Sequence, residues 1–192
     1  MKKLVFFASG SGSNFQAVID AIQNNEIEAV ITGLITDKES AGALLRAKNH
    51  QIETKVILNF GSASSNEELE QQLQIWNPDL IVLAGFLRKI PTNIIRQYPD
   101  KIINIHPALL PKFGGKGFYG RHVHNAVIEA GETKSGCTVH YVNEEYDEGA
   151  IIRQSIVDVH PEDSAETLAK RVLSEEHKAL PAVIKQILNQ NN

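Results

Sequence analysis

Along the first half of the chain, short apolar runs alternate with longer segments in which apolar residues recur every three or four positions. The apolar runs are typical of strands buried on both faces of a parallel sheet. They cover residues 3–9, 28–37, 54–58, 79–85 and 101–106. The segments between them have helical spacing and cover residues 14–25, 40–50, 66–76 and 91–100. This order predicts a Rossmann-like, doubly wound sheet with helices on both faces.

The pattern changes after residue 111. Residues 122–131 have helical spacing, with Gly131 expected at the helix end. Residues 136–143 and 150–159 instead alternate across an intervening turn, which predicts an antiparallel pair of strands. We therefore expect an α/β fold whose mostly parallel sheet has an antiparallel pair added toward the C-terminus.

The C-terminal segment, residues 161–190, has the spacing of one or two helices. Ser164 is placed to cap the first turn, and Pro181 is expected to break or kink the pattern. No repeat, low-complexity block or linker rich in Pro or Ser interrupts the chain, so we expect a single domain over residues 1–192.

Composition narrows the possible partners. The 192 residues are 42% hydrophobic, which is enough for a sizeable core. The formal charge is −4 and no basic stripe is present, so we expect no nucleic-acid partner. No apolar run approaches the ~20 residues of a membrane-spanning helix, so we expect no membrane partner. Cys137 is the only cysteine, which excludes an intrachain disulfide and favours a core role and a cytoplasmic location.

The segment SGSGSN, residues 9–14, joins the first strand to the first helix. Glycines let a ligand approach the backbone, and a helix start offers unpaired N–H groups and a positive dipole end. A phosphate-type anion is the favoured guest. The alternative is a tight turn with a Ser or Asn cap, because the segment lacks both the third glycine of a dinucleotide fingerprint and the lysine of a P-loop.

Asn104 and His106 end the fifth strand, and side chains two apart in a strand point to the same side. Both can therefore face one reacting atom: the amide is a neutral donor, and the imidazole moves a proton or, when protonated, holds an oxyanion. Asp147, in the turn 143–149, would raise the pKa of a neighbouring histidine. The alternatives are a capping Asn with a satisfied His, and ordinary turn chemistry for Asp147.

Three further features have weaker signals. Gly85 follows a strand and suits a flat ligand against the backbone, or is simply a turn. Glu175 and Glu176 alone read as a solvated helix face. The scattered histidines are not expected to bind a metal; they are His122, His124, His140 and His160.

Together, five segments resemble the phosphoribosylglycinamide formyltransferase family of folate-dependent enzymes. They are VFFASGSGSN, PDLIVLAGFLRKI, INIHPALLPKF, SGCTVHYVNEEYDEGAII and SEEH, and the similarity runs over nearly all 192 residues. The resemblance implies transfer of the formyl group of 10-formyltetrahydrofolate to the amine of glycinamide ribonucleotide in purine biosynthesis. It implies no metal, because the formyl donor is already activated.

The resemblance also assigns site residues. The catalytic ones are Asn104, His106 and Asp147, with Asn104 and protonated His106 at the formyl oxygen and Asp147 keeping His106 charged. The residues implied to bind the phosphate and glycinamide groups are Gly12, Ser13, Asn14, Phe15 and Glu176. Those for folate are Leu87, Arg88, Lys89, Ile90, Asn104, Asn143, Glu144, Glu145, Tyr146 and Asp147.

The chain departs from the family pattern at three places. Residues 114–120, GGKGFYG, replace a shorter Pro-Gly connection; we call them the glycine-rich loop and expect a mobile flap near the site. Asn66 stands where many members have an arginine that approaches the folate tail. Glu148 stands where a glycine is common.

Other functions remain as alternatives. A methionyl-tRNA formyltransferase shares the Asn-x-His element but adds a C-terminal tRNA-holding domain, which we do not expect in an acidic chain that ends near residue 192. A formyltetrahydrofolate hydrolase would carry an extra N-terminal domain, which we do not expect either. A non-catalytic folate- or nucleotide-binding module would not need the proton-transfer set. The expected partners are small molecules, and the protein is expected to be a monomer or homodimer.

Overall fold

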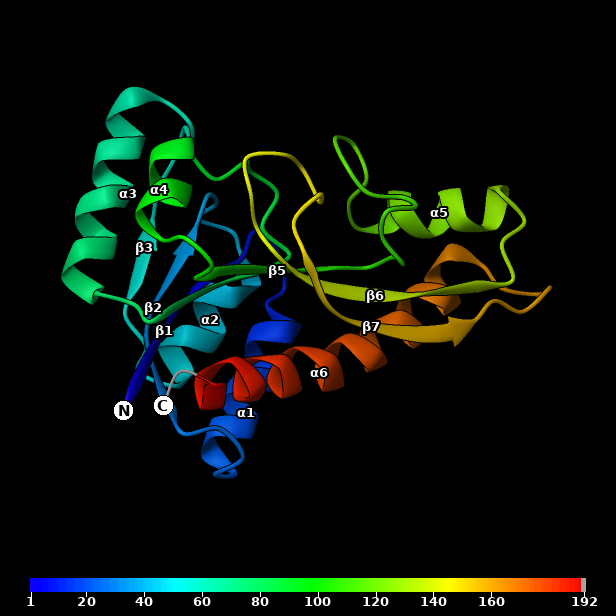
Figure 1. Cartoon of the computed structure of the whole chain (residues 1–192), viewed down its shortest axis with the longest axis horizontal. Coiled ribbons are helices and arrows are strands. Elements are labelled where there is room, and N and C mark those ends of the chain that lie inside the picture. Colours follow the sequence, from blue (N-terminus) through cyan, green and yellow to red (C-terminus); the bar gives the residue numbers. More distant parts are fainter. Residues whose placement is uncertain (191–192) are drawn as a thin grey trace.

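A seven-stranded mixed sheet, in the order β3-β2-β1-β4-β5-β6-β7, forms the centre of the computed structural model, which describes residues 1–190 (Figure 1). The parallel strands are β1 (Lys2–Phe7), β2 (Ala29–Thr36), β3 (Thr54–Val56), β4 (Leu80–Ala84) and β5 (Ile102–His106). The antiparallel strands are β6 (Lys134–Tyr141) and β7 (Ile151–Asp158). The predicted doubly wound sheet with an added antiparallel pair is therefore confirmed.

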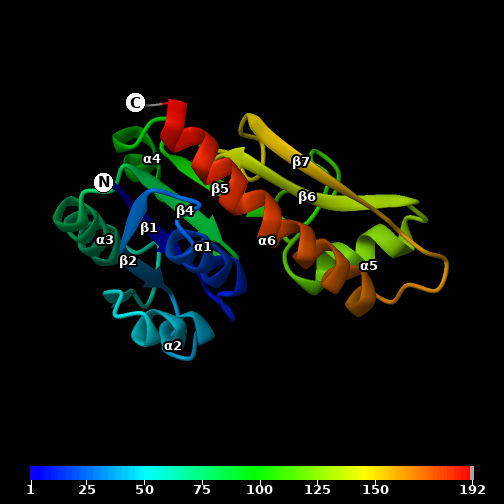
Figure 2. The same ribbon diagram turned by 90° about the horizontal axis from the view of Figure 1, so that it is seen from below.

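Helices cover both faces of the sheet (Figure 2). On one face, a large apolar core is shared by α1 (Ser13–Gln23), α2 (Gly42–Asn49), α5 (Arg121–Glu129) and α6 (Ala165–Gln190). On the other face, a second core is shared by α3 (Ala63–Trp76) and α4 (Thr92–Gln97). Among residues 1–190, no helix combines the length and apolarity needed to cross a membrane.

The C-terminal segment is one continuous helix, α6. Ser164 caps it as predicted, because its Oγ accepts a hydrogen bond from the Thr167 N–H at 3.2 Å. Of the expected break or kink at Pro181, the break is wrong: the proline lies inside the helix, and the nearby Leu180 and Val183 are fully buried. A proline removes one hydrogen bond of the helix ladder, and burial of this apolar face keeps the two halves together.

The sheet topology determines where a ligand can lie. The connection after β1 leads to β2 on one side, whereas β4 lies on the other side of β1. In such sheets the crevice beyond the carboxyl ends of the two diverging strands is the usual ligand site. The segments that follow β1, β4 and β5 all leave the sheet at this edge, and they contain the three motifs singled out from the sequence.

Gly33, in β2, provides a test of the packing on the α3 face. An added Cβ would lie 2.4 Å from the Trp76 ring. The ring cannot withdraw freely, because its Nε1–H donates to Glu53 Oε2 at 2.7 Å. We predict that Gly33→Ala lowers the free energy of unfolding by roughly 1–3 kcal/mol, as overpacking typically does, measured by urea denaturation.

The control is a double-mutant cycle with Trp76→Leu, which removes the ring that the new methyl group would meet. The cost of Gly33→Ala should then shrink, because residues in contact are not additive. An equal cost in both backgrounds would show that another neighbour is responsible.

Candidate active site

A cavity of about 760 Å³ lies at the carboxyl ends of β1, β4 and β5. Its walls are the start of α1, the segment after β4, the end of β5, the glycine-rich loop, the β6–β7 turn and one face of α6. Most of the residues singled out from the sequence line it. Those on its wall are Gly12, Ser13, Asn14, Leu87, Arg88, Lys89, Ile90, Asn104, His106, Asn143, Glu145, Tyr146, Asp147 and Glu176.

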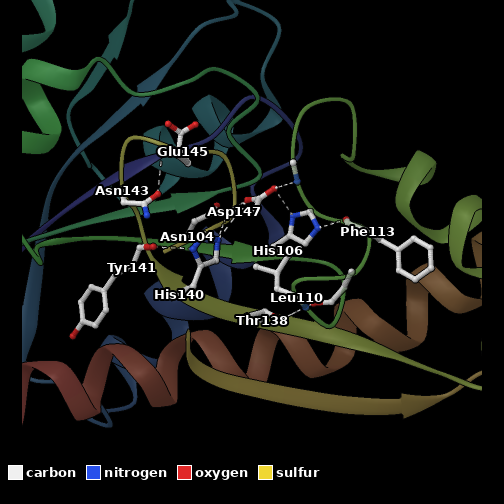
Figure 3. Close-up of polar contacts among 12 residues, drawn as sticks. Asn104, His106, Leu110, Phe113, Thr138, His140, Tyr141, Asn143, Glu145 and Asp147 are labelled. Carbon is white, nitrogen blue, oxygen red and sulfur yellow. Dashed lines mark hydrogen bonds and ion pairs between the residues drawn. The ribbon is translucent and has the colours of Figure 1, made fainter. Parts of the chain in front are cut away.

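Asn104, His106 and Asp147 meet at one point of this wall (Figure 3). Asp147 Oδ2 lies 3.6 Å from His106 Nδ1, and Asp147 Oδ1 accepts a long, 3.4 Å hydrogen bond from Asn104 Nδ2. The Gly115 N–H also donates to Asp147 Oδ2, at 2.9 Å. Asn104 and His106 therefore do present their side chains on one side of β5, and the carboxylate lies against both.

Backbone contacts define the state of His106. Its Nε2 lies 2.8 Å from the Phe113 carbonyl oxygen, which only accepts, so Nε2 carries a proton. In the neutral ring, Nδ1 then presents its lone pair toward Asp147. Burial lowers the pKa of His106 more than Asp147 and the Phe113 carbonyl raise it, so the net pKa is below the usual 6.5. Asp147 does raise the pKa of this histidine, as expected, but the net lowering speaks against the expectation that Asp147 keeps it protonated.

For Asp147, the neighbouring groups outweigh the effect of burial on the pKa. Burial raises its pKa, but the hydrogen bond to His140, the nearby His106 and the Gly115 N–H lower it further, so the net pKa is below 3.8. The carboxylate is thus ionised at neutral pH.

His140 is a site residue that the sequence did not reveal. It is the cross-strand partner of Asn104 between β5 and β6. Its Nδ1 lies 2.8 Å from the Tyr141 carbonyl oxygen and therefore carries a proton, and its Nε2 lies 3.1 Å from Asn104 Nδ2 and 3.5 Å from Asp147 Oδ1. His140 therefore orients the Asn104 amide. Only the register between β5 and β6 would have placed His140 next to Asn104, and this register cannot be deduced from the sequence.

The segment after His106 is fixed by polar contacts from the antiparallel pair. Thr138 Oγ1 donates to the Ala108 carbonyl at 2.6 Å and accepts from the Leu110 N–H at 3.1 Å. Gln154 Nε2 donates to the Leu110 carbonyl at 3.0 Å. These contacts anchor the chain just before Phe113, whose carbonyl holds His106.

The start of α1 forms the other end of the cavity. Gly12 adopts φ +72°, and an added Cβ would lie 2.7 Å from Ala43 Cβ, so both conformation and packing require glycine. Arg46 Nε donates to the Ser11 carbonyl at 2.8 Å and steadies the loop from outside. The Phe15 side chain lies in the core against Phe6, with ring centroids 5.1 Å apart, so only its main chain belongs to this end.

Glu176 joins α6 to this end of the cavity. Asn14 Nδ2 donates to Glu176 Oε2 at 2.6 Å, while Asn14 Oδ1 is buried and has no partner among residues 1–190. Burial raises the pKa of Glu176 to about 7, although the Asn14 amide lowers it. Glu176, which the sequence alone suggested to be part of a solvated helix face, is therefore buried and titrates near neutrality.

The wall after β4 is tied to the sheet. The Leu87 N–H donates to Ser9 Oγ at 3.1 Å, and Arg88 Nε donates to Asp37 Oδ2 at 2.8 Å. Lys89 Nζ lies 5.3 Å from the centre of the Tyr146 ring, across the cavity mouth.

Four residues singled out by the family resemblance do not line the cavity, which are Phe15, Asn66, Glu144 and Glu148. Glu144 pairs with Arg96 at 3.0 Å and fastens the β6–β7 turn to α4. Asn66 lies on α3 and does not line the cavity. Within residues 1–190, no three His, Cys, Asp or Glu side chains gather as ligands for a metal ion.

Comparison with known proteins agrees on one family. The formyl transferase family model matches residues 2–184. The phosphoribosylglycinamide formyltransferase of Bacillus subtilis is 39% identical over 100% of this chain and 97% of its own. The chloroplastic enzyme of that name from Arabidopsis thaliana is 42% identical over 98% of this chain, which spans 66% of the relative's length. The crystal structure of the Bacillus halodurans enzyme of that name has a TM-score of 0.91 at 35% identity, covering 100% of this chain and 97% of that one.

The raised pKa of Glu176 predicts a pH-dependent stability. Below pH ~4.5 the carboxyl is protonated in both folded and unfolded chains, but between ~4.5 and about 7 only the folded chain keeps the proton. Its contribution to stability is therefore lost as the pH rises through about 7. We predict that Glu176→Gln equals the wild type at pH ~4.5 and exceeds it by on the order of 2–4 kcal/mol at pH ~8, measured by urea denaturation.

Glu175→Gln is the matched control, because Glu175 is on the same turn but pairs with Lys178 at the surface. It should show no such gain with pH. If the two variants respond alike, burial of Glu176 is not the cause.

Proposed function

This chain belongs to the formyl transferase family, and we propose that it transfers the formyl group of 10-formyltetrahydrofolate to the amine of glycinamide ribonucleotide. The products are formylglycinamide ribonucleotide and tetrahydrofolate, and the reaction is a step of de novo purine biosynthesis. The observation that carries this proposal is the meeting of Asn104, His106 and Asp147 in a cavity that also contains the glycine-rich start of α1.

The cavity offers a place for each substrate. The phosphate of the ribonucleotide lies on Gly12, Ser13 and Asn14, where unpaired N–H groups of the helix start favour an anion. Its glycinamide group reaches Glu176, whose buried position next to Asn14 supports a polar contact. The folate lies between residues 87–90 and the turn 143–147, which face one another at Lys89 and Tyr146.

The first chemical step is attack of the free amine on the formyl carbon. A C–N bond forms, and negative charge develops on the formyl oxygen. Asn104 Nδ2 exchanges its long 3.4 Å contact with Asp147 for this oxygen, while His140 keeps the amide oriented. One such donor is typically worth ~3–4 kcal/mol in the transition state.

The proton transfers involve His106 and Asp147. His106 starts neutral, with its Nε2–H on the Phe113 carbonyl, and the proton lost by the amine passes to the His106–Asp147 pair. The imidazolium that forms is stabilised by the Asp147 carboxylate beside Nδ1. The proton then goes to the departing folate nitrogen as its bond to the formyl carbon breaks.

We extend the proposal to the setting of the enzyme. One formyltransferase domain spans residues 1–192, of which the last two lie outside the described residues; the family match over residues 2–184 supports this. The two small molecules are its partners, and the reaction needs no metal. A cytoplasmic location is supported by Cys137, a sole cysteine that is free and buried.

A direct assay tests the function. Purified protein is mixed with glycinamide ribonucleotide and 10-formyl-dideazafolate, and the absorbance of the deformylated product is followed. Turnover should require the ribonucleotide, with methionyl-tRNA and no added amine as controls. Turnover with another amine but not with the ribonucleotide would contradict the assignment, and folate binding without turnover would indicate a binding module.

We predict that His106→Ala and Asp147→Asn each lower kcat by at least ~100-fold, because a positioned acid–base group typically contributes that much. Binding of the folate analogue, measured by fluorescence quenching, should persist, since the walls at residues 87–90 and 143–146 remain.

His160→Ala is the control, because His160 is exposed and does not line the cavity. Near-wild-type turnover in both site variants would remove His106 and Asp147 from the mechanism.

A further inference from the structure

The glycine-rich loop is only partly accounted for by the proposed chemistry. Residues 115–120 all line the cavity, yet the reaction uses only the Gly115 N–H, which donates to Asp147. Lys116, the next residue, is exposed and has no ion pair or hydrogen bond within residues 1–190. The loop therefore presents an unpaired cation at the cavity wall.

The ribonucleotide end of the cavity needs such a cation. The start of α1, residues 10–14, contributes no basic side chain to the wall. The facing side of α6 contributes only apolar and acidic residues, which are Ala165, Glu166, Ala169, Leu173 and Glu176. A helix start supplies the equivalent of about half a positive charge, which does not balance a phosphate dianion beside the Glu176 carboxyl group.

Most of the other cations near the cavity are already engaged. Arg88 is bonded to Asp37, and Lys89 lies over the Tyr146 ring, both at the folate end. Arg121 also lines the wall without an ion pair or hydrogen bond within residues 1–190, but its backbone is fixed at the start of α5 and its charge acts on Glu166. Arg46 donates to the Ser11 carbonyl and to Gln16 Oε1 and is off the wall. Lys116 is the unpaired cation that lies on a segment whose glycines leave its backbone free to move.

The backbone around Lys116 allows it to be re-aimed. Gly115 and Gly117 have φ +91° and +98°, and an added Cβ at either would meet no atom within 4 Å. The shape of the loop is thus set by glycine conformations and not by packing. The Gly115 N–H holds one end at Asp147, and lysine adds a flexible four-carbon stem that ends in a compact charge.

We infer that Lys116 binds the phosphate group of the ribonucleotide and thereby makes the enzyme select the phosphorylated acceptor. The inference rests on the proposed function and adds a specificity residue to it. The phosphate is held between the N–H groups at the start of α1 and the Lys116 ammonium, which reaches in from the opposite wall. The carboxylates of a folate tail are the competing ligand for this cation, and the test distinguishes the two.

The test compares acceptors with and without the phosphate. We predict that Lys116→Met lowers kcat/KM for glycinamide ribonucleotide by about 10- to 100-fold, the range of one charge-assisted contact. Values for the unphosphorylated glycinamide riboside, and the KM of the formyl-folate analogue, should not change. Lys116→Arg should retain most of the selectivity for the phosphorylated acceptor.

Lys112→Met is the matched control, because Lys112 precedes the same loop, pairs with Glu132 at 2.7 Å and does not line the cavity. It should behave as the wild type with both acceptors. Equal losses with ribonucleotide and riboside, an effect confined to the folate KM, or no effect of Lys116→Met would each overturn the inference.

A binding measurement separates this inference from the proposed function. Inorganic phosphate is titrated into wild-type, Lys116→Met and Lys112→Met protein by calorimetry, which needs no turnover. Binding that weakens by about 10-fold or more only in Lys116→Met supports the phosphate contact, even if the wild type formylates a different acceptor. Binding that is equal in all three proteins contradicts it.

Discussion

A buried carboxylate needs partners, and the catalytic end of this protein is built around that requirement. The Asp147 side chain is 13% exposed and lies among His106, His140, Asn104 and the Gly115 N–H. These groups come from β5, from β6 and from the glycine-rich loop. They meet only because the antiparallel strand β6 is added next to β5, so the departure from a purely parallel sheet is what completes the site.

Burial shifts the pKa of a titratable side chain at each end of the cavity toward the uncharged form. At His106 and at Glu176 the removal of water favours the uncharged form of the side chain. Asp147 and Asn14 respectively shift these two pKa values in the opposite direction, but by less. His106 is thereby ready to accept a proton when the amine attacks, and a nearby carboxylate stabilises the cation that results. Burial thus contributes to reactivity as well as to stability.

Local features of the chain were readable from the sequence, and features that depend on distant partners were not. Apolar runs revealed the parallel sheet, and the two-residue spacing placed Asn104 and His106 on one side. His140 was missed because its role depends on cross-strand register. The net lowering of the His106 pKa could not be predicted from the sequence, because burial is a property of the whole fold. The break predicted at Pro181 does not occur, because the packing of α6 outweighs the tendency of proline to interrupt a helix.

The contacts from Phe113 to His106 and from Gly115 to Asp147 are both made by main-chain atoms. Main-chain groups are present whatever side chain a position has, so point changes in this segment can alter selectivity and leave both contacts in place. A deletion or insertion between His106 and Gly115 has no such freedom, because it displaces the carbonyl or the N–H from its partner. The length of this part of the connection is therefore constrained more tightly than its composition, whereas the part after Gly115 makes neither contact.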